Sequence, residues 1–452
     1  MIRTLWHRAF LVERPSISLS LFRLAMAFTV GAHVIPSLLR LDENYLSSAF
    51  KTKNFSFFPI AILRVVEASP DWVVGLFVVA FYVTLTLFTL GLWSQISCIL
   101  MTLVCYYFYA LNDYHIGTLS FDILLVSLFL MSVTNYHGDF LSLDSLRRTD
   151  TQAHRRLRPI FIQRMLQLQL AWTFVYTALS KITGGGNWLT GNPYYTLIHY
   201  PAIGVVRDFP LRAWLGEHPG LCYGLGITLL AFEMTIPILW FVQRTRLFGI
   251  GLGILFQIML WLTLHVPTIF LFLFPPMMLL FIEPERLVAW IEAKRRQMAL
   301  RPHGRLLYDG RCGFCVESVR RLQVLDLFGW VETVDFNQQA ELSKIHPSLT
   351  PERCRREMVL IEPNGQLSGG FAAFRRLCLH LPLLRVLLPV VYLPASGWIG
   401  RHIYRWIARR RYRLFHNPTC QTNQCALPET DAGSSRSSAS ASEDSESGSA
   451  KT

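Results

Sequence analysis

The sequence predicts an all-α polytopic membrane bundle followed by a small α/β domain, and its composition and patterning carry this prediction. The 452-residue chain is 52% hydrophobic and only 16% charged, which is too apolar for an ordinary soluble enzyme. Apolar runs continue as far as Ile282, and short alternating segments follow. The net charge of +13 could serve an acidic partner such as nucleic acid, but basic loops beside a membrane explain it with fewer assumptions.

About eight apolar segments approach the length of roughly 20 residues that a helix needs to cross a bilayer. We expect these spans at Ile17–Leu39, Trp72–Leu92, Gln95–Leu111, Leu119–Val133, Ile160–Ile182, Leu221–Val242, Leu247–His265 and Pro267–Ile282. The fourth and the last are the shortest. The basic N-terminal segment 1–15 carries no small-residue cleavage site and is typical of the flank of a retained first span.

The basic residues predict the orientation of the bundle, because positively charged loops stay in the cytoplasm. With an even number of spans, one side collects Arg3, Arg8, Arg14, Arg147, Arg148, Arg155, Arg156, Arg158, Arg244, Arg246, Lys294, Arg295 and Arg296. The other side has mainly Lys51, Lys53, Arg64, Arg207 and Arg212. We therefore expect both termini in the cytoplasm, the loops Asp42–Asp71 and Thr183–Gly220 outside, and a bacterial inner membrane as the location. An odd span count would overturn this.

A soluble domain is expected over 304–415, after a linker at 286–303. Arg305–Asp309 is predicted as a strand that ends at the turn signal of Asp309 and Gly310. The next elements are predicted as a helix to about Leu327, a strand at Val331–Val334, a helix near Gln338–Ile345, a hairpin over Met358–Leu367 around Asn364 and Gly365, and a helix at Phe371–Leu381. This is a thioredoxin-like order.

Two cysteines three residues apart, Cys312 and Cys315, stand where the first strand gives way to a helix. Backbone N–H groups and the positive end of the helix dipole stabilise a thiolate there, and Arg311 adds a neighbouring cation. Cys312 is therefore the predicted nucleophile, and Cys315, one turn on, is the predicted resolving thiol. Asp309 and Arg311 are predicted to shape the local field.

Half of a zinc site is the alternative interpretation of this pair, because two cysteines at this spacing often bind metal together with a second pair. Cys420 and Cys425 are the candidate second pair, although their spacing is longer and they fall in an expected tail. The thioredoxin-like order favours redox chemistry, so no metal site is predicted.

The segment Ser396–Phe415 interleaves aromatic and basic residues. Packing on a membrane surface is the favoured interpretation, and nucleic-acid binding is the alternative. The tail over 416–452 is Ser-rich and has few apolar residues, so it is expected to be disordered.

The stretch from Asp309 to Cys315 resembles the DCC family of thiol-disulfide oxidoreductases, named for the pattern Asp-x-x-Cys-x-x-Cys. The resemblance covers about Gly304–Phe415, and its flanking parts are Asn364–Gly365, Gly369–Gly370 before Phe371–Leu377, and Tyr404–Arg409. It implies a thioredoxin-like fold, protein-disulfide reductase activity, and a thiol or disulfide protein as substrate.

Ionisable residues within membrane spans are costly, so each one is a candidate functional group. They are Arg23, Asp122, Arg164, Lys181, Glu233 and His265. Lys181 ends the fifth apolar run before a glycine-rich turn, where desolvation favours the neutral amine and would let it act as a base. A lysine that snorkels to the interface is the structural alternative.

The bundle over about Ser16–Glu285 resembles the horizontally transferred transmembrane (HTTM) domain, which is related to the vitamin K-dependent gamma-carboxylases. The similar stretches are Phe121–Asp122, Arg164–Leu170, Tyr176, Ser180–Lys181, Trp188, Gly191, Phe232–Phe241, Arg246, His265, Phe272 and Phe274. The resemblance implies that Lys181 matches the base that deprotonates vitamin K hydroquinone, so a quinone is the candidate cofactor. The Asn-His pair of the carboxylases is displaced, since Asn112 and His115 are not adjacent here, and their large luminal portion is missing.

The sequence thus predicts a thiol-disulfide oxidoreductase anchored in the lipid bilayer. In the alternative hypothesis the bundle is a quinone- or lipid-handling enzyme or transporter and the dithiol domain regulates it. A scaffold with an inactive redox domain is the third.

Overall fold

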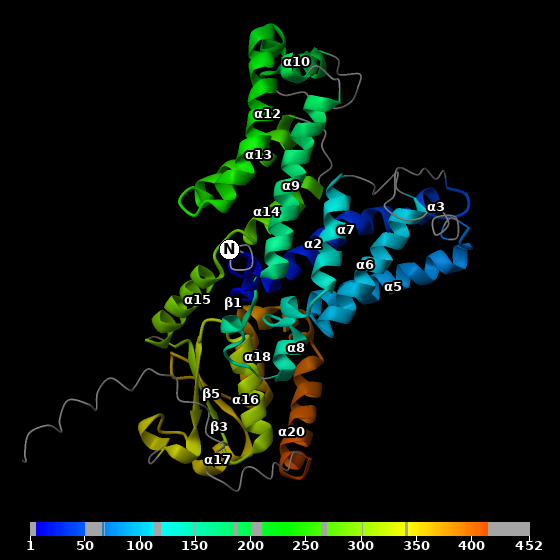
Figure 1. The fold of residues 1–452 in the computed structure, drawn as a ribbon. Coiled ribbons are helices and arrows are strands. Elements are labelled where there is room, and N and C mark those ends of the chain that lie inside the picture. Colours follow the sequence, from blue (N-terminus) through cyan, green and yellow to red (C-terminus); the bar gives the residue numbers. More distant parts are fainter. Residues whose placement is uncertain are drawn as a thin grey trace, which may run out of the picture. The chain divides into compact units, whose positions relative to one another are not determined.

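The computed structural model describes residues 6–49, 66, 68–112, 119–148, 150–184, 188–190, 192–199, 210–263, 269–300, 302–339 and 342–414. The chain divides into two compact units, Met1–Arg296 and Gln297–Thr452, and each has hydrophobic clusters of its own. In its described residues the first unit is helical apart from one short two-stranded ribbon, and the second unit contains a four-stranded sheet with helices (Figure 1). This confirms the predicted fold class.

The first unit follows the predicted run of apolar segments. Its longer helices are α2 (Ile17–Leu38), α5 (Asp71–Leu90), α6 (Ser94–Leu111), α7 (Leu119–Ser132), α9 (Phe161–Thr183), α12 (Pro219–Phe241), α13 (Arg246–Thr263), α14 (Ile269–Leu279) and α15 (Pro284–Ala299). Short elements join them, namely η1 (His7–Leu11), α3 (Leu41–Asn44), η2 (Tyr136–Gly138), α8 (Leu143–Arg148), η3 (Ala153–Arg155), η4 (Trp188–Thr190), α10 (Asn192–His199) and α11 (Arg212–Gly216). Strands β1 (Glu13–Pro15) and β2 (Leu157–Pro159) pair in antiparallel fashion.

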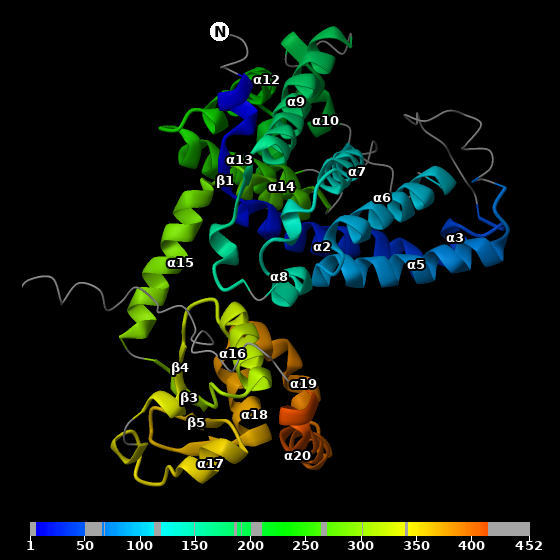
Figure 2. The ribbon, with the colours of Figure 1, turned by 60° about the horizontal axis from the view of Figure 1, so that its bottom comes forward.

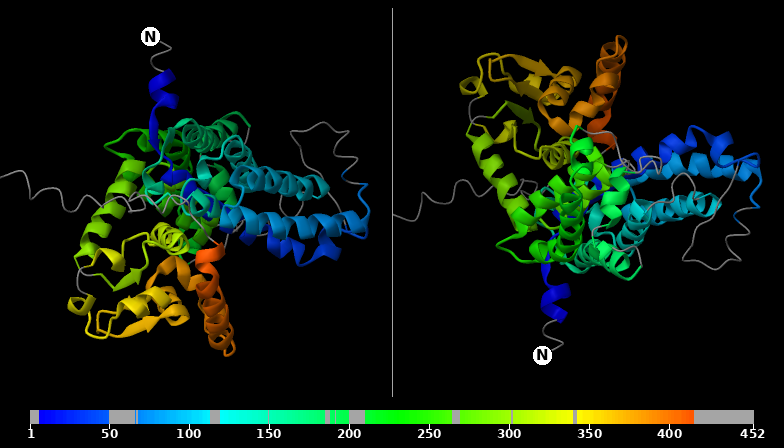
Figure 3. Two further views of the ribbon diagram at one scale, coloured as in Figure 1. Left: turned by 90° about the horizontal axis from the view of Figure 1, so that it is seen from below. Right: turned by 90° about the horizontal axis from the view of Figure 1, so that it is seen from above.

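Neighbouring helices in this unit pack through fully buried aromatic side chains. Helix α5 lies along α6, and α6 contacts α7, while α9 packs on α12 and α2 on α14 (Figure 3). Phe81 and Phe108 meet edge to face between α5 and α6, and Phe174 meets Trp240 in the same way between α9 and α12. Such contacts hold helices together in lipid, where the hydrophobic effect between helices is weak.

Helix α5 ends where a side chain would have no room. Gly91 takes a left-handed conformation with φ +63°, and a Cβ there would lie 1.6 Å from Nη1 of Arg23. The guanidinium of Arg23 is fully buried and donates to the backbone oxygens of Leu141 and Phe88. Arg23 therefore serves to join α2 to the ends of neighbouring segments.

The number of helices that qualify as spans is smaller than predicted. In the described residues, five are long and apolar enough to cross a membrane, namely α2, α5, α6, α12 and α13, against the eight expected. Each of the other three expected spans is also a helix, but α7 and α14 are too short, and α14 contains Pro275 and Pro276. Helix α9 has the length but too many polar residues.

The polar residues of α9 bond to neighbouring helices, which explains its low apolarity. Gln163 and Gln167 both donate to the backbone oxygen of Leu280, at 2.5 and 2.6 Å. Gln169 donates to the oxygen of Ile123 in α7 and accepts from the Ser127 hydroxyl. Hydrogen bonds between helices satisfy polar groups that lipid cannot, so a low mean hydropathy is compatible with an interior helix.

The second unit is built around a mixed sheet in the order β4-β3-β5-β6 (Figure 2). Its strands are β3 (Gly304–Tyr308), β4 (Val331–Asp335), β5 (Val359–Ile361) and β6 (Leu367–Gly369). Its helices are α16 (Gly313–Leu325), η6 (Phe336–Gln338), η7 (Leu342–Lys344), α17 (Pro351–Arg356), α18 (Gly370–His380), η8 (Pro382–Leu387), α19 (Leu388–Val391) and α20 (Ser396–Leu414). Strand β3 is parallel to β4 and antiparallel to β5, as in a thioredoxin-like fold.

Alternation along the central strands buries both faces of this sheet. Leu306 and Tyr308 of β3 join the cluster that includes residues of α16 and α18. Leu307, between them, joins the opposite cluster with Phe336 and Leu349. Successive side chains of a strand point to opposite faces, so a continuous apolar run is what a central strand of this kind needs.

One element of the second unit differs from expectation. The helix predicted near Gln338–Ile345 is wrong, because the described residues there form only η6 and η7. The side chain of Asp335 accepts from the N–H of Asn337 and thereby caps a tight turn. The stretch expected as a linker, 286–303, is largely taken up by α15, and the tail over 416–452 lies outside the described residues.

Candidate functional site

The dithiol sits at the start of α16, directly after the central strand. Cys312 is the N-cap residue, with φ −94° and ψ 108°, and its carbonyl accepts the first helical bond from Val316. Its own N–H donates to the oxygen of Asp309, which closes the turn between β3 and α16. Cys315 is the third residue of the helix, one turn on. The two side chains therefore belong to the same helix end, where unsatisfied amide N–H groups gather.

Both cysteine side chains are buried, although Arg311 beside them is exposed. Cys312 and Cys315 are each 1% exposed and belong to the cluster formed by the sheet, α16 and α18. Cys378 of α18 shares this cluster, and burial raises its pKa to about 11. Both sulfurs therefore become accessible from solvent only if the turn opens.

A network of carboxylates and amide groups braces the turn that carries the dithiol. Asp309, which is 4% exposed, accepts from the N–H of Arg311 at 3.1 Å and from Nδ2 of Asn337 at 2.8 Å. Asp335 accepts from the N–H of Gly310 at 2.9 Å and from Nδ2 of Asn337 at 3.0 Å. The Asn337 amide thus links both aspartates and ties the end of β4 to the turn.

Sequence reasoning missed Asp335 and Asn337. A signal was present, because β3 and β4 are parallel, and the carboxyl ends of adjacent parallel strands meet at one edge of the sheet. Gly310 belongs to the same arrangement: a Cβ there would lie 2.0 Å from Oδ2 of Asp335. Burial, with Asp335 as the second cause, also raises the pKa of Tyr308 to about 12, so its hydroxyl stays protonated.

In the first unit, the structure brings two of the predicted membrane candidates together. Nζ of Lys181, near the end of α9, lies 2.5 Å from Oε1 of Glu233 in α12. The side chain of Glu233 is 8% exposed and that of Lys181 is 23% exposed, and the ammonium also lies 5.4 Å from the ring centre of Trp188. The second oxygen of Glu233, Oε2, is buried and has no hydrogen-bond partner among the described residues.

The other membrane candidates lie apart from this pair or outside the described residues. Asp122 is half-buried in the first turn of α7. Arg164 donates to Oε1 of Gln167, one turn further along α9. His115 and His265 fall outside the described residues.

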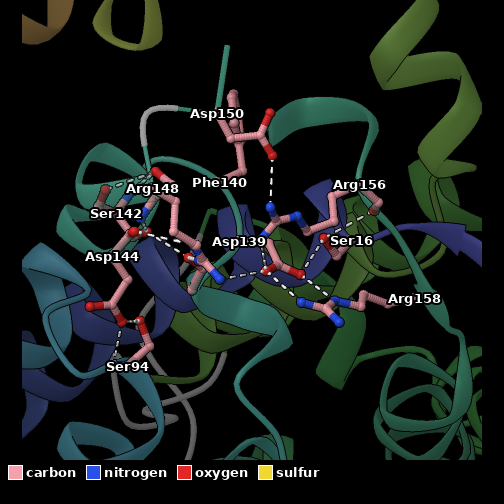
Figure 4. Close-up of polar contacts among 12 residues, drawn as sticks. Ser16, Ser94, Asp139, Phe140, Ser142, Asp144, Arg148, Asp150, Arg156 and Arg158 are labelled. Carbon is pink, nitrogen blue, oxygen red and sulfur yellow. Dashed lines mark hydrogen bonds and ion pairs between the residues drawn. The ribbon is translucent and has the colours of Figure 1, made fainter. Parts of the chain in front are cut away.

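A buried carboxylate with several arginines forms a second cluster that sequence reasoning did not single out (Figure 4). Asp139 is fully buried, and Arg158 meets it with two hydrogen bonds, Nε to Oδ2 at 2.8 Å and Nη2 to Oδ1 at 3.1 Å. Arg156 and Arg148 approach Oδ1 at 3.3 and 3.5 Å, and the Ser16 hydroxyl donates to Oδ2. The bond to Asp139 is the first cause of a raised pKa at Arg158.

A neighbouring carboxylate caps the start of α6 (Figure 4). Asp144 accepts from the N–H groups of Trp93 and Ser94 and from the Ser94 hydroxyl, at 3.0, 2.7 and 2.6 Å. Burial by itself would raise the pKa of Asp144, but the hydrogen bonds outweigh it and hold this pKa below its usual value. These arginines and aspartates therefore hold the loops at one end of the bundle together. We interpret their role as stabilising the fold.

The described residues contain no group of three or more His, Cys, Asp and Glu side chains that could hold a metal ion. Cys420 and Cys425, the second half of the zinc alternative, lie outside the described residues.

Comparison with known families gives two matches in tandem. Residues 13–286 match the HTTM domain, and residues 306–417 match the DCC1-like thiol-disulfide oxidoreductase domain. No curated protein and no solved structure matches the chain. The apolar helices and the two matches together describe a multi-pass membrane thiol-disulfide oxidoreductase. The HTTM match covers more than half of the chain, so the chain belongs to the HTTM domain family, with a DCC1-like thiol-disulfide oxidoreductase domain after the membrane bundle.

Proposed function

We propose that the protein reduces disulfide bonds in protein substrates through the dithiol Cys312–Cys315. The observation that carries the proposal is the position of the two residues, at the N-cap and the third residue of one helix. The N–H groups and the positive dipole end there favour negative charge on the sulfur of Cys312. Cys315 lies within the same turn, so it is close to any bond formed at Cys312.

The reaction conserves atoms and electrons in two exchanges. The Cys312 thiolate attacks one sulfur of the substrate disulfide and releases the other as a thiolate. Cys315, as a thiolate, then attacks the sulfur of Cys312. This breaks the mixed disulfide and releases the substrate sulfur that was bound to Cys312. The substrate gains two electrons, and the protein holds a disulfide between Cys312 and Cys315. A dithiol reductant must reduce that disulfide before the next turnover.

Asp309 acts as a positioning residue in this proposal. Its carboxylate bonds Arg311 and Asn337, so it fixes the turn on which Cys312 stands. Arg311, which is exposed, adds positive charge where a substrate disulfide would arrive. Since both sulfurs are buried, we expect opening of this turn to limit the rate.

Reduction of insulin by the full chain in detergent tests the dithiol. Cys312→Ser is expected to abolish reduction, whereas Cys315→Ser is expected to trap a mixed disulfide that a thiol reductant releases. Cys354→Ser, at a buried cysteine of α17, is the matched control and should keep the wild-type rate. Undiminished reduction by Cys312→Ser would refute the nucleophile assignment.

We also propose that α7, α9 and α14 cross the membrane together with the five apolar helices, which makes the number of spans even. Both termini then lie in the cytoplasm, and the membrane is the inner membrane of a bacterium. The basic residues of the first unit support this, because Arg148, Arg156 and Arg158 gather around a single buried carboxylate and leave an excess of positive charge. A dithiol in the reducing cytoplasm is kept available as a reductant. A C-terminal fusion to a reporter active only outside the cytoplasm should be inactive, and activity would contradict this orientation.

A second candidate function belongs to the bundle, and the Lys181–Glu233 pair favours it. The buried, unpartnered Oε2 of Glu233 beside an ammonium provides a place for a polar head group such as that of a quinone or lipid. In this case the dithiol domain regulates the bundle. Extraction of the purified protein should yield a quinone or lipid that Glu233→Gln loses and Asp150→Asn retains; equal yields from both variants would remove this candidate.

A further inference from the structure

Helix α20 is anchored to the second unit by one face only. The hydroxyl of Tyr404 accepts from the N–H of Met358, and the ring of Phe371 reaches into the space that a side chain at Gly400 would fill. Ile407 and Ala408 are half-buried beside them. The other side chains between Trp398 and Arg410 are exposed.

The outward face carries large apolar side chains in the open. Ile399, Ile403 and Trp406 follow one another at helical spacing and are 46, 54 and 51% exposed, and Trp398 is 64% exposed. In the segment that leads into α20, Val386 of η8 and Val390 of α19 are also exposed, at 81 and 63%. Several large apolar side chains exposed close together in the sequence indicate a binding surface for an apolar partner.

The neighbouring side of the helix is strongly basic. Arg401, Arg405 and Arg409 repeat every four residues and are exposed, and Arg410 lies over the ring of Trp406 at 4.8 Å. No acidic residue occurs between Ser396 and Leu414. Exposed arginines next to exposed tryptophan and isoleucine are typical of a helix that binds a bilayer containing anionic lipid. The apolar side chains enter the acyl-chain region, and the arginines contact the negatively charged head groups.

Crossing the membrane is the less favourable arrangement for this segment. Pro382–Val391 and Ser396–Arg410 are together apolar enough for a span, but they are bent by 110° with respect to each other. Insertion would place the four arginines of Ser396–Arg410 in hydrocarbon, whereas a helix lying in the interface keeps them among head groups.

We propose that α20 docks on the surface of an anionic bilayer, with Ile399, Ile403 and Trp406 inserted and Arg401, Arg405 and Arg409 among the lipid phosphates. The first unit spans the membrane, and the second is part of the same chain, so a bilayer is always within reach. The inference is independent of the disulfide chemistry proposed above.

Site-specific photocrosslinking of the full chain in lipid vesicles tests the docking. A benzophenone amino acid replaces Ile403, and in the matched control it replaces exposed Glu352 on α17. In vesicles of phosphatidylcholine with phosphatidylglycerol, we expect at least about fivefold more lipid adduct at 403 than at 352, because each basic residue near such a surface strengthens binding roughly fivefold. Vesicles of phosphatidylcholine alone, or the added substitution Arg405→Glu, should lower the adduct at 403 by a similar factor.

Other occupants of this face give other products. Equal lipid adducts at 403 and 352 would overturn the proposal, and so would a main adduct with a second copy of the chain, with nucleic acid or with another part of the same chain. A benzophenone at Trp406 repeats the measurement if the Ile403 variant folds poorly. Arg405→Glu should leave the reduction of a small soluble disulfide unchanged, so failure of the docking is distinguishable from failure of the dithiol chemistry.

Discussion

Gly310 is the residue of the dithiol turn at which a side chain has no space. Its Cβ would lie 2.0 Å from Oδ2 of Asp335, whose other oxygen accepts from the Gly310 N–H. We expect Gly310→Ala to push Asp335 away, to destabilise the domain by about 1–3 kcal/mol and to lower the rate of insulin reduction. Thermal unfolding and the reduction rate are measured together.

A substitution at a glycine far from the dithiol is the control for Gly310→Ala. It distinguishes general backbone strain from displacement of the dithiol turn. Gly365 has φ +80° and open space around its Cβ, so Gly365→Ala strains the hairpin without a steric clash. It should lower stability while the reduction rate of the folded protein stays at the wild-type value. A wild-type rate in Gly310→Ala would mean that the turn tolerates displacement of Asp335.

Asp139 balances three arginines from a fully buried position. Its removal leaves Arg148, Arg156 and Arg158 facing one another, so Asp139→Ala is expected to destabilise the first unit by about 3–5 kcal/mol. Among the described residues, Asp150 forms an ion pair only with Arg156 and is 28% exposed, so Asp150→Ala should cost only about 0–1 kcal/mol. The unfolding temperatures of the two variants are compared in detergent. Equal decreases would show that the burial of Asp139 does not increase the contribution of its ion pairs to stability.

Two buried histidines predict how stability responds to acid. Burial lowers the pKa of His137 and of His154 to about 4, and Arg295 and Arg155 contribute further at His154. An unfolded histidine titrates near 6.5, so the unfolded chain takes up protons between about pH 6.5 and 4 while the folded chain does not. Stability should therefore fall as the pH drops through this window and level off below it.

The unfolding temperature as a function of pH measures this effect. His154→Gln should flatten the decline, whereas His402→Gln, at an exposed position of α20, should leave the profile unchanged. A decline confined to pH below 4 would assign the acid sensitivity to carboxylates instead.

At the level of elements, Lys181 and Glu233 join α9 to α12 within the bundle. Replacing one partner, in Lys181→Met or Glu233→Leu, leaves the other charge buried and is expected to cost about 3–5 kcal/mol. The double variant should cost less than the sum, with a coupling of about 0.5–3 kcal/mol in the thermal unfolding of the detergent-solubilised chain. Additive losses would contradict a direct ion pair.

The helices of the bundle were predictable from sequence because each apolar run is long and bounded, and all eight expected segments are helical. The span count was not, because the sequence does not reveal which polar residues have partners on other helices. Gln163, Gln167 and Gln169 of α9 illustrate this: they lower the apolarity of the helix, yet each bonds to a neighbouring segment.

The dithiol turn was predictable for the same local reasons, since a strand, a turn signal and two cysteines follow one another within a few residues. Asp335 and Asn337 were not identified, because their role depends on the parallel pairing of β3 and β4, which joins residues far apart in sequence. The pairing of Lys181 with Glu233 likewise required the packing of α9 on α12.

At the level of the whole molecule, the hydrophobic clusters of the two units share no residue. We therefore expect two separate thermal transitions for the full chain in detergent. Val359→Ala, at a fully buried position of the sheet, should lower only one of them, by an amount equivalent to about 0.5–2 kcal/mol. Phe81→Leu, at a fully buried position of α5, should lower only the other, and a single transition that moves with both variants would show one cooperative unit.

From the burial of Cys312 and Cys315 we also expect resistance of the two thiols to oxidative damage. Thiolates that hydrogen peroxide can reach progress to sulfinic and sulfonic acids, which exchange cannot repair. Residues of β3, α16 and α18 enclose both sulfurs, so we expect peroxide to reach them only while the turn is displaced. A protein substrate bound to the displaced turn would block this access. In the proposed exchange, the enclosure that limits the rate is therefore expected to protect the two thiols during oxidative stress as well.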